Sequence, residues 1–344
     1  MTRRYVVTGA QGFLGRYLAA HLLREEADCA VLGIGRSPRG DTHFTHTLAW
    51  SGAPVPTPLP PELRDAARDP RYAYASVDVS DAAALGRTLA DFRPHAVFHL
   101  ASGLRGYARD ALYRTNLGGT RALLAAVAAA APDVERVVLG SSAAVYGSGP
   151  GIAPPFAEDA PTRPGDAYGR SKLAAERACR ATAAARAVPV VRARIFNLVG
   201  PGQDERHAAG RFAGRLAAMA FAGLPPVLDV GSLSPTRDWM DVRDAASATA
   251  LLARRGVPGQ AYNVATGIEV AVRDVLDALV ARSGVPVDVR EDRAGPPPGE
   301  PRHFADVRRL RALGFAPAFP LHATLADLWD YYLQTACHGV STPV

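Results

Sequence analysis

Tyr168 and Lys172 are the residues best suited to proton chemistry, because they stand four positions apart in an alanine-rich segment, 167–187, that is predicted to be helical. Residues at this spacing share one helical face. A phenol titrates near pH 10, and a neighbouring ammonium lowers that pKa by roughly 1–3 units, toward the range useful for proton transfer. Of the 39 cationic residues, 38 are Arg and one is Lys172. An exposed helix often carries such a pair, so the spacing alone has low specificity.

Ser142 is the third candidate catalytic residue. It follows the apolar run 136–140, which predicts a buried strand. A residue at the end of a parallel strand lies at the carboxyl edge of the sheet, where ligands bind. The serine, the tyrosine and the lysine in this order form a much more specific signal than any of them alone.

A glycine-rich loop, 8–15, joins a predicted strand to a predicted helix. Its spacing is G-x-x-G-x-x-G, where the general dinucleotide fingerprint has G-x-G-x-x-G. Glycines let the backbone turn tightly and approach a pyrophosphate, which the amides of the helix N-terminus then bind. A purely structural turn is the alternative. The candidate cofactor-binding residues of this loop are Gly9, Gln11, Gly12, Phe13, Leu14 and Gly15.

The end of the second predicted strand favours NADP(H) over NAD(H). An acidic residue about 20 positions after the glycine loop binds the ribose 2′-hydroxyl of NAD. Gly35, Arg36 and Ser37 stand there instead. An arginine with no competing carboxylate suits a 2′-phosphate. Stacking of Arg36 on the adenine, with NAD(H) as cofactor, is the alternative. Asp78 and Val79, after the third strand, are expected at the adenine edge.

Alternating strands and helices predict an α/β fold, a Rossmann-type doubly wound parallel sheet with a smaller C-terminal substrate-binding lobe. We expect a dinucleotide-binding domain at 1–196, with a Pro-rich insertion at 37–72, a substrate-binding lobe at 197–336 with some segments returning to the sheet, and a tail at 337–344. A loop as long as 37–72 is uncommon, and 43–50 is a candidate extra strand. The expected strands are 4–8, 30–34, 73–77, 96–100, 136–140 and 188–195, and the expected helices are 13–24, 82–91, 108–131 and 167–187.

Composition excludes several other classes of protein. With 48% apolar and 21% charged residues the chain is globular. It contains no apolar run long enough for a membrane span, and its N-terminus does not resemble a signal peptide. Three scattered cysteines predict a cytoplasmic protein without a metal site. The net charge is +6, but the basic residues form no cluster with aromatics, so we expect no nucleic-acid partner.

Together these motifs resemble the extended short-chain dehydrogenases/reductases of the NAD(P)-dependent nucleotide-sugar epimerase/dehydratase family. The matching segments are TGAQGFLG at 8–15, HLAS at 99–102, NLGGT at 116–120, SSAAVYG at 141–147 and YGRSK at 168–172. The resemblance implies that Ser142 and Tyr168 hold a sugar oxygen, that Tyr168 transfers the proton, and that Lys172 binds the nicotinamide ribose. It adds Leu100, Ala101, Ser102 and Asn116 to the cofactor site, and implies a homodimer formed through 108–131 and 167–187.

Within the family, the segments 194–203, 230–244 and 262–267 are closest to GDP-4-keto-6-deoxy-mannose reductases and GDP-mannose 4,6-dehydratases, which implies a nucleotide-diphosphate sugar, GDP-linked, as substrate. Asn197 and Arg237 are the implied diphosphate contacts, and an arginine fork suits phosphate oxygens. A surface ion pair is the alternative for Arg237. The further candidate substrate-binding residues are Ser142, Gln203, Arg211 and Arg302.

The sequence departs from the family's dehydratases directly after Ser142. They carry an acidic pair there, whereas this chain has Ala143 and Ala144. Methyl groups transfer no protons, which argues against 4,6-dehydration. Two reactions remain: an NADPH-dependent reduction of a C4 ketone, and an NAD-dependent 4-epimerisation. A catalytically dead nucleotide sensor is a third possibility, disfavoured by the complete Ser142, Tyr168 and Lys172 set.

Overall fold

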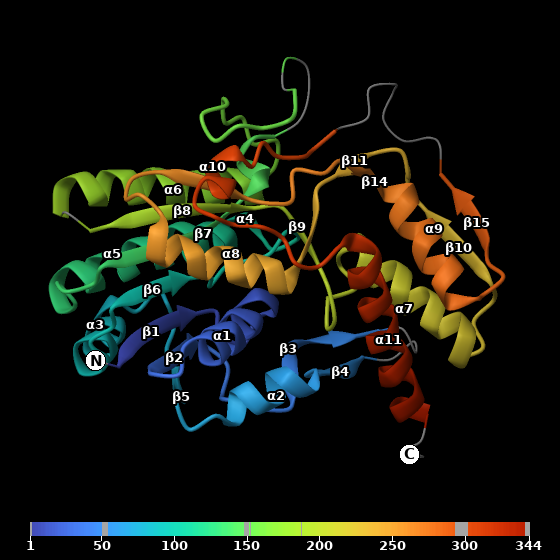
Figure 1. The fold of residues 1–344 in the computed structure, drawn as a ribbon, viewed down its shortest axis with the longest axis horizontal. Helices are drawn as coiled ribbons and strands as arrows, with labels where there is room; N and C mark the ends of the chain where they lie inside the picture. Colours follow the sequence, from blue (N-terminus) through green and yellow to red (C-terminus); the bar gives the residue numbers. More distant parts are fainter. Residues whose placement is uncertain are drawn as a thin grey trace.

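Seven parallel strands form the central sheet, in the order β13-β8-β7-β6-β1-β2-β5 (Figure 1). The computed structural model describes residues 2–49, 54–147, 151, 153–186, 188–292 and 302–340. The strand order runs outward in both directions from β1 and β6, which defines a topological switch point at their carboxyl ends. The predicted doubly wound α/β fold is therefore confirmed. The strands are β1 (Arg3–Thr8), β2 (Cys29–Gly35), β5 (Tyr72–Ser76), β6 (Ala96–His99), β7 (Arg136–Ser142), β8 (Val190–Ile195) and β13 (Ala261–Val264).

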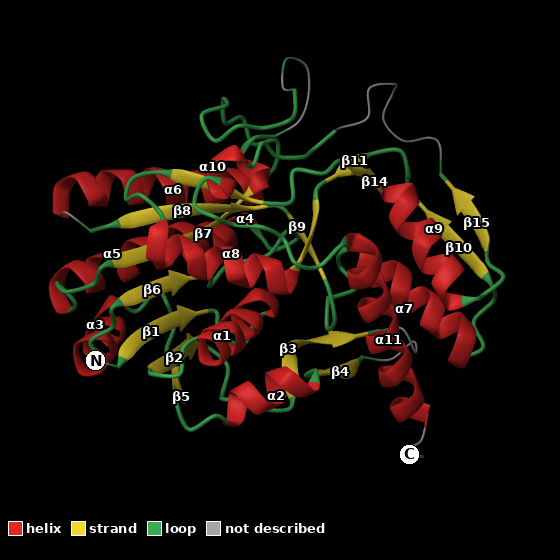
Figure 2. Ribbon diagram, in the orientation of Figure 1, coloured by secondary structure: helices red, strands yellow, loops and turns green. Residues whose placement is uncertain are grey.

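Helices cover both faces of this sheet, because successive strand residues point to opposite sides. In β1, Tyr5 and Val7 pack into the core beneath α1 (Phe13–Glu25) and α8 (Val242–Arg255). Val6, between them, packs into the core of the other face. That face is covered by α3 (Ala82–Phe92), α5 (Gly119–Ala130) and α6 (Ala167–Arg186) (Figure 2). The carboxyl ends of the strands thereby remain available for a site.

The helix expected at 108–131 is present but changes its winding. It consists of α4 (Arg109–Tyr113), a π-helical turn (Arg114–Gly118) and α5. π-turns inside helices occur often at functional sites. Asn116 lies in this turn and is 2% exposed. The irregular turn therefore directs one of the candidate residues inward.

The Pro-rich insertion folds into a hairpin and a helix that connect the two lobes. β3 (His43–Leu48) pairs antiparallel with β4 (Val55–Pro58), and α2 (Pro61–Arg68) follows. Phe44 is buried against the second lobe so closely that a Cβ on Gly202 would lie 2.3 Å from its ring. The Tyr331 hydroxyl donates to the Pro58 carbonyl at 2.7 Å. The extra strand expected at 43–50 exists to Leu48, and residue 50 lies outside the described residues.

The second lobe has its own core, formed by α7 (Ala208–Phe221), α9 (Val272–Ser283) and α11 (Leu321–Val340). α11 includes the first residues of the expected tail, and 341–344 lie outside the described residues. Among the described helices, none combines the length and apolar character needed to cross a bilayer.

Short strands of the second lobe form two-stranded sheets. They are β10 (Val227–Val230) with β15 (Asp288–Glu291), β9 (Asn197–Val199) with β12 (Trp239–Asp241), and β11 (Thr236–Arg237) with β14 (Val270–Ala271). The short helix α10 is Arg308–Arg311.

Candidate active site

The glycine loop packs against the chain that leaves β6. Gly9 has a φ of +69°, and a Cβ there would lie 2.7 Å from the Ala101 nitrogen. A Cβ on Gly15 would lie 2.2 Å from the Gly9 carbonyl oxygen. Only glycine combines this backbone conformation with this packing. The structure therefore brings the predicted loop and the predicted segment 100–102 together at the switch point of the sheet.

The N-terminus of α1 fits the pyrophosphate of a dinucleotide. Gly12 precedes the helix and provides no side-chain cap, and the first turn contains no acidic residue. The first amides of a helix have no partner within it and carry the positive end of its dipole. With Phe13 and Leu14 at its start, this end of α1 has the chemistry of an anion site beside a backbone cradle.

The loop after β2 is held in place by the glycine loop. The Gln11 amide donates to the Pro38 carbonyl at 2.8 Å and accepts from the Gly40 nitrogen at 2.7 Å. Since these contacts occupy the side chain of Gln11, its backbone is the part left for the predicted cofactor contact, which stays a prediction. The Tyr74 hydroxyl donates to the Ser37 carbonyl at 2.8 Å. Arg36 and Ser37 are exposed on this fixed loop.

Asp78 and Val79 lie near the same end of the sheet. Asp78 is exposed, and hydrogen bonds from the backbone and hydroxyl of Ser80 lower the pKa of its carboxyl, with a smaller effect from the charge of Arg36. Val79 is buried against Gly119, where a Cβ would lie 2.8 Å away. Asp78 is therefore a charged, accessible group beside Arg36, whereas Val79 packs the start of α5.

Lys172 is buried on the inner face of α6. Its Nζ donates to the Gly140 carbonyl at 2.8 Å and lies 6.0 Å from the centre of the Tyr168 ring. The side chain is 6% exposed, and burial lowers the pKa of the ammonium to about 8, opposed by the charge of Glu176. Lys172 is therefore cationic at neutral pH and places its charge at the carboxyl end of β7.

Tyr168 lies beside Ser142, close enough for a hydrogen bond between their hydroxyls. That the two hold one sugar oxygen, as the family resemblance implies, stays a prediction. The lowered pKa that the sequence predicted for this phenol is not found, because burial raises the pKa, and a hydrogen bond with the Ser142 hydroxyl only acts in the opposite direction. α6 approaches the end of β7 closely here, because a Cβ on Gly169 would lie 2.6 Å from the Ala144 carbonyl oxygen. The short helical turn after Ser142 (Ala143–Val145) presents no carboxylate.

Asn116 uses its side chain to join the segments around Tyr168. Its Oδ1 accepts from the Ser102 hydroxyl at 3.0 Å and from the Gly103 nitrogen at 2.8 Å. Its Nδ2 donates to the Ser171 hydroxyl at 2.8 Å. Asn116 therefore fixes the loop after β6 against α6. Its role as a cofactor contact stays a prediction.

A buried ion pair that the sequence reasoning missed lies one turn below Lys172. Glu176 is fully buried and accepts two hydrogen bonds from Arg194, both at 2.9 Å, and one from the Ser141 hydroxyl at 2.6 Å. A bidentate pair of this kind is geometrically specific. The spacing of Glu176 four residues after Lys172 was the available signal, because both must lie on the inner face of α6.

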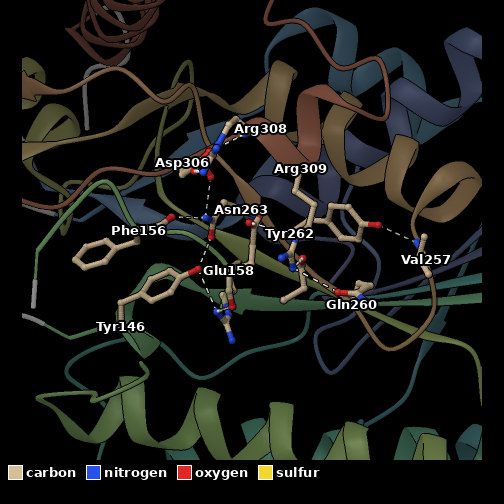
Figure 3. Close-up of polar contacts among 12 residues, drawn as sticks. Tyr146, Phe156, Glu158, Val257, Gln260, Tyr262, Asn263, Asp306, Arg308 and Arg309 are labelled. Atoms are coloured by element: carbon tan, nitrogen blue, oxygen red, sulfur yellow. Dashed lines mark hydrogen bonds and ion pairs between the residues drawn. The ribbon is translucent and has the colours of Figure 1, made fainter. Parts of the chain in front are cut away.

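The same network continues toward the second lobe. Arg194 also donates to the Tyr146 hydroxyl at 3.0 Å, and that hydroxyl donates to Asn263 Oδ1 at 2.6 Å. Figure 3 shows Asn263 between Tyr146, Phe156 and Asp306. The Asn263 amide donates to the Phe156 carbonyl at 2.7 Å and to the Asp306 carbonyl at 3.0 Å. These bonds fix the chain after 302 against the sheet.

Two predicted substrate contacts come together through this chain. Arg237 forms a β-bridge with His303, so it lies next to Arg302 along the backbone. Arg237 is partly buried and donates to the Thr236 carbonyl at 2.7 Å. Arg302 is exposed, and Glu269 accepts two hydrogen bonds from its guanidinium, both at 2.6 Å. The guanidinium of Arg302 is therefore already paired with an anion from the protein.

The other predicted substrate contacts are held by nearby backbone. Asn197 donates to the Asp238 carbonyl at 3.2 Å. Gln203 is 2% exposed, and its amide donates to the Leu198 carbonyl at 2.5 Å, so its side chain stabilises the turn after β9. Arg211 is exposed and donates to the carbonyls of Glu205 and Arg206, both at 3.3 Å. Gln203 is therefore buried in this turn, whereas the exposed Arg211 keeps guanidinium N–H groups that these two bonds do not use.

His303 is a further residue near Ser142 that the sequence reasoning missed. Its ring lies 4.9 Å from the ring of Phe156 and 5.5 Å from that of Phe196. Burial lowers the pKa of the imidazole to about 4, with a further lowering by Arg237, while the backbone of Ala143 acts in the opposite direction. The imidazole is therefore neutral at pH 7. A histidine in a polar segment offered no sequence signal for this position.

Proteins of known sequence and structure resemble this chain over most of its length. A profile of the NAD dependent epimerase/dehydratase family matches residues 5–265. The dTDP-6-deoxy-L-talose 4-dehydrogenase (NAD(P)(+)) of Kitasatospora kifunensis is 31% identical over 330 residues, 95% of this chain and 94% of that protein. The GDP-6-deoxy-D-mannose reductase of Pseudomonas aeruginosa is 31% identical over 300 residues, 86% and 84% of the two chains. RMD from Pseudomonas aeruginosa, solved with NADPH, has a TM-score of 0.75 at 26% identity and covers 97% of this chain and 100% of its own. The protein belongs to the NAD dependent epimerase/dehydratase family, as its motifs predicted.

Proposed function

We propose that this NAD(P)-dependent nucleotide-sugar enzyme is an NADPH-dependent reductase of a nucleotide-diphosphate 4-keto-6-deoxy sugar. The observation that carries the proposal is that Ser142, Tyr168 and Lys172 meet at the carboxyl end of β7, close to the segment 100–102 that packs on the glycine loop. Ala143 and Ala144 directly follow Ser142. This arrangement has one proton donor for an oxygen next to a cofactor site. It has no acidic pair after Ser142 for removing a hydroxyl group.

In the proposed reaction, side chains of the protein bind and protonate the sugar oxygen. When bound, a nicotinamide cofactor supplies the hydride. The Ser142 and Tyr168 hydroxyls hold the C4 carbonyl oxygen by hydrogen bonds, and Tyr168 gives that oxygen its proton. The ammonium of Lys172 stabilises the resulting phenolate and is fixed in place by the Gly140 carbonyl. The cycle then needs a proton from solvent to restore the phenol.

The choice of NADPH rests on the loop after β2. Gln11 and Tyr74 hold this loop so that Arg36 is exposed at the end of the strand, where NAD-specific proteins place a carboxylate. A guanidinium pairs well with a 2′-phosphate. The similarity to RMD from Pseudomonas aeruginosa, which was solved with NADPH, supports the same choice. The alternative is an NAD-dependent 4-epimerase, because the same serine, tyrosine and lysine would also serve that reaction.

On the substrate side, we propose a GDP-linked sugar, held at its diphosphate by Arg237 with Asn197 and Arg302 nearby. The similarity to a GDP-6-deoxy-D-mannose reductase supports this preference. We also propose a cytoplasmic homodimer. α5 and α6 lie side by side on one face of the sheet, where they can form a four-helix contact with a second copy (Figure 1).

Native mass spectrometry of freshly purified protein tests the proposed cofactor, the proposed dimer and the proposed nucleotide preference together. The reductase proposal predicts a dimer that arrives without cofactor and takes up NADPH. The epimerase alternative predicts tightly retained NAD⁺, because an epimerase regenerates its cofactor in each cycle. Addition of GDP and of dTDP in separate runs then compares the two nucleotides.

A further inference from the structure

Arg105 places a second cation beside the ring of Tyr168. It lies on the loop after β6, and its Cζ is 5.7 Å from the centre of the Tyr168 ring, close to the 6.0 Å measured for the Nζ of Lys172. A guanidinium within about 6 Å of an aromatic ring is attracted to it. The catalytic tyrosine therefore has a cation from its own helix and another from a separate segment of the chain.

Asp166 fixes Arg105 and the first turn of α6 at once. Its Oδ2 accepts from the Nε of Arg105 at 2.7 Å. Its Oδ1 accepts from the Gly169 nitrogen at 2.7 Å, which is the bond of a helix N-cap. Tyr168 lies within this capped turn. The ion pair thus joins the loop after β6 to the backbone that carries the tyrosine.

The charged and polar groups that face the phenol come from three elements. Ser142 is the last residue of β7, Ser102 and Arg105 belong to the loop after β6, and Asp166 and Lys172 belong to α6 and its cap. The charge of Arg105 favours the phenolate, and the charge of Asp166 disfavours it. Arg105 is 70% exposed, so water weakens its effect in the open site.

We propose that Arg105 and Asp166 are positioning residues for Tyr168, holding its ring and setting, through their opposite charges, how readily its hydroxyl releases a proton. The role of Tyr168 as proton donor rests on the proposed function. The effect of the pair on the phenol does not, and can be measured without any substrate.

Tyrosine labelled with ¹³C at Cζ provides that measurement, with the Tyr168 signal assigned by its absence in Tyr168→Phe. Arg105→Gln removes the positive charge and should move the Tyr168 titration to higher pH. Asp166→Asn keeps a capping side chain and should move it to lower pH. We expect shifts of about 0.3–1 unit, below the effect of a buried neighbouring charge because the pair is exposed. Arg109→Gln is the matched control, because Arg109 lies 5.8 Å from the ring of Tyr113 instead.

Opposite shifts in the two variants, with none in Arg109→Gln, would support the proposal. Shifts in the same direction, or titrations that overlay the wild type, would overturn it. In turnover assays the alkaline limb of the pH profile should move in the same two directions, and Arg105→Lys should restore its position. If Arg105→Gln raises KM while the Tyr168 titration stays fixed, Arg105 only binds substrate and the proposal fails. Opposite NMR shifts in a protein that reduces no keto-sugar would instead refute the proposed function alone.

Discussion

The cofactor side and the substrate side of the candidate site differ in how firmly the protein holds the side chains predicted to act there. On the cofactor side, Lys172 is buried, bonded to the Gly140 carbonyl and close to Tyr168. On the substrate side, the guanidinium of Arg302 is exposed and engaged by Glu269. One side has its reactive groups in place. On the other side, the groups proposed to bind phosphate are held by one carboxylate and by backbone carbonyls of the protein.

This difference has a physical reason. A group that must transfer a proton gains from a fixed geometry and a dry environment, because its protonation state depends on both. A group that binds a charged ligand can be held by a surface ion pair of small strength until the ligand replaces it. The cofactor side should therefore tolerate substitution poorly, whereas the substrate side should respond with graded changes in affinity.

The largest effect is expected from Lys172→Arg. A planar guanidinium cannot take the place of a compact ammonium between the Gly140 carbonyl and the Tyr168 ring. Turnover should fall by at least about 10²-fold, the low end for loss of positioned proton transfer. Keto-sugar-dependent NADPH oxidation measures it. A near-normal rate would show that the cofactor side does not require the geometry described above.

Lys172→Met should raise the free energy of unfolding and remove activity. This result would sharpen the contrast between the cofactor side and the substrate side. The pKa of Lys172 is lowered to about 8 in the folded protein, below the usual 10.5, so its charge destabilises the fold at pH 7. That cost is complete below pH 8 and disappears as the pH rises to about 10.5. Urea unfolding should show a gain of about 1–3 kcal/mol at pH 7. The gain should shrink toward pH 10, and a gain independent of pH would assign it to packing instead.

Arg36→Ala should weaken NADPH binding by about 1–3 kcal/mol, the size of a charge-assisted contact, and leave NADH binding nearly unchanged. Arg39→Ala is the matched control, because Arg39 donates to the Ala67 carbonyl and lies over the Tyr72 ring. Fluorescence titrations with both cofactors provide the test. Equal losses for NADPH and NADH would remove the 2′-phosphate assignment.

The smallest effect is expected at the ion pair on the substrate side. Glu269→Gln removes the anion that engages Arg302 and should tighten GDP binding severalfold at most, because the pair is exposed. Arg237→Ala in the same calorimetric titration should weaken GDP binding and leave NADPH binding unchanged. Weaker GDP binding in Glu269→Gln would mean that Glu269 supports the nucleotide site rather than competing for it.

Local sequence patterns were enough to predict most of the fold. Alternating strands and helices predicted the sheet, and its order placed Gly9, Ser142 and Tyr168 at one edge. The hairpin at 43–58 was hard to predict because prolines interrupt β4, which only an edge strand allows. The pairing of Glu269 with Arg302 joins residues 33 positions apart. Arg105 sits in a loop without periodicity. Contacts of this kind depend on tertiary structure, so no local sequence pattern predicts them.

The proposed reaction depends most on Tyr168 as the proton donor. Tyr168→Phe removes only a hydroxyl, so the fold and NADPH binding should persist. Turnover of a GDP-4-keto-6-deoxy sugar should fall about 10²–10⁴-fold, the usual contribution of a positioned acid. Ser142→Ala, which removes one hydrogen bond and no proton transfer, should lose less. A Tyr168→Phe enzyme that binds NADPH normally and reduces the keto-sugar at nearly the wild-type rate would contradict the account, because the proton would then come from elsewhere.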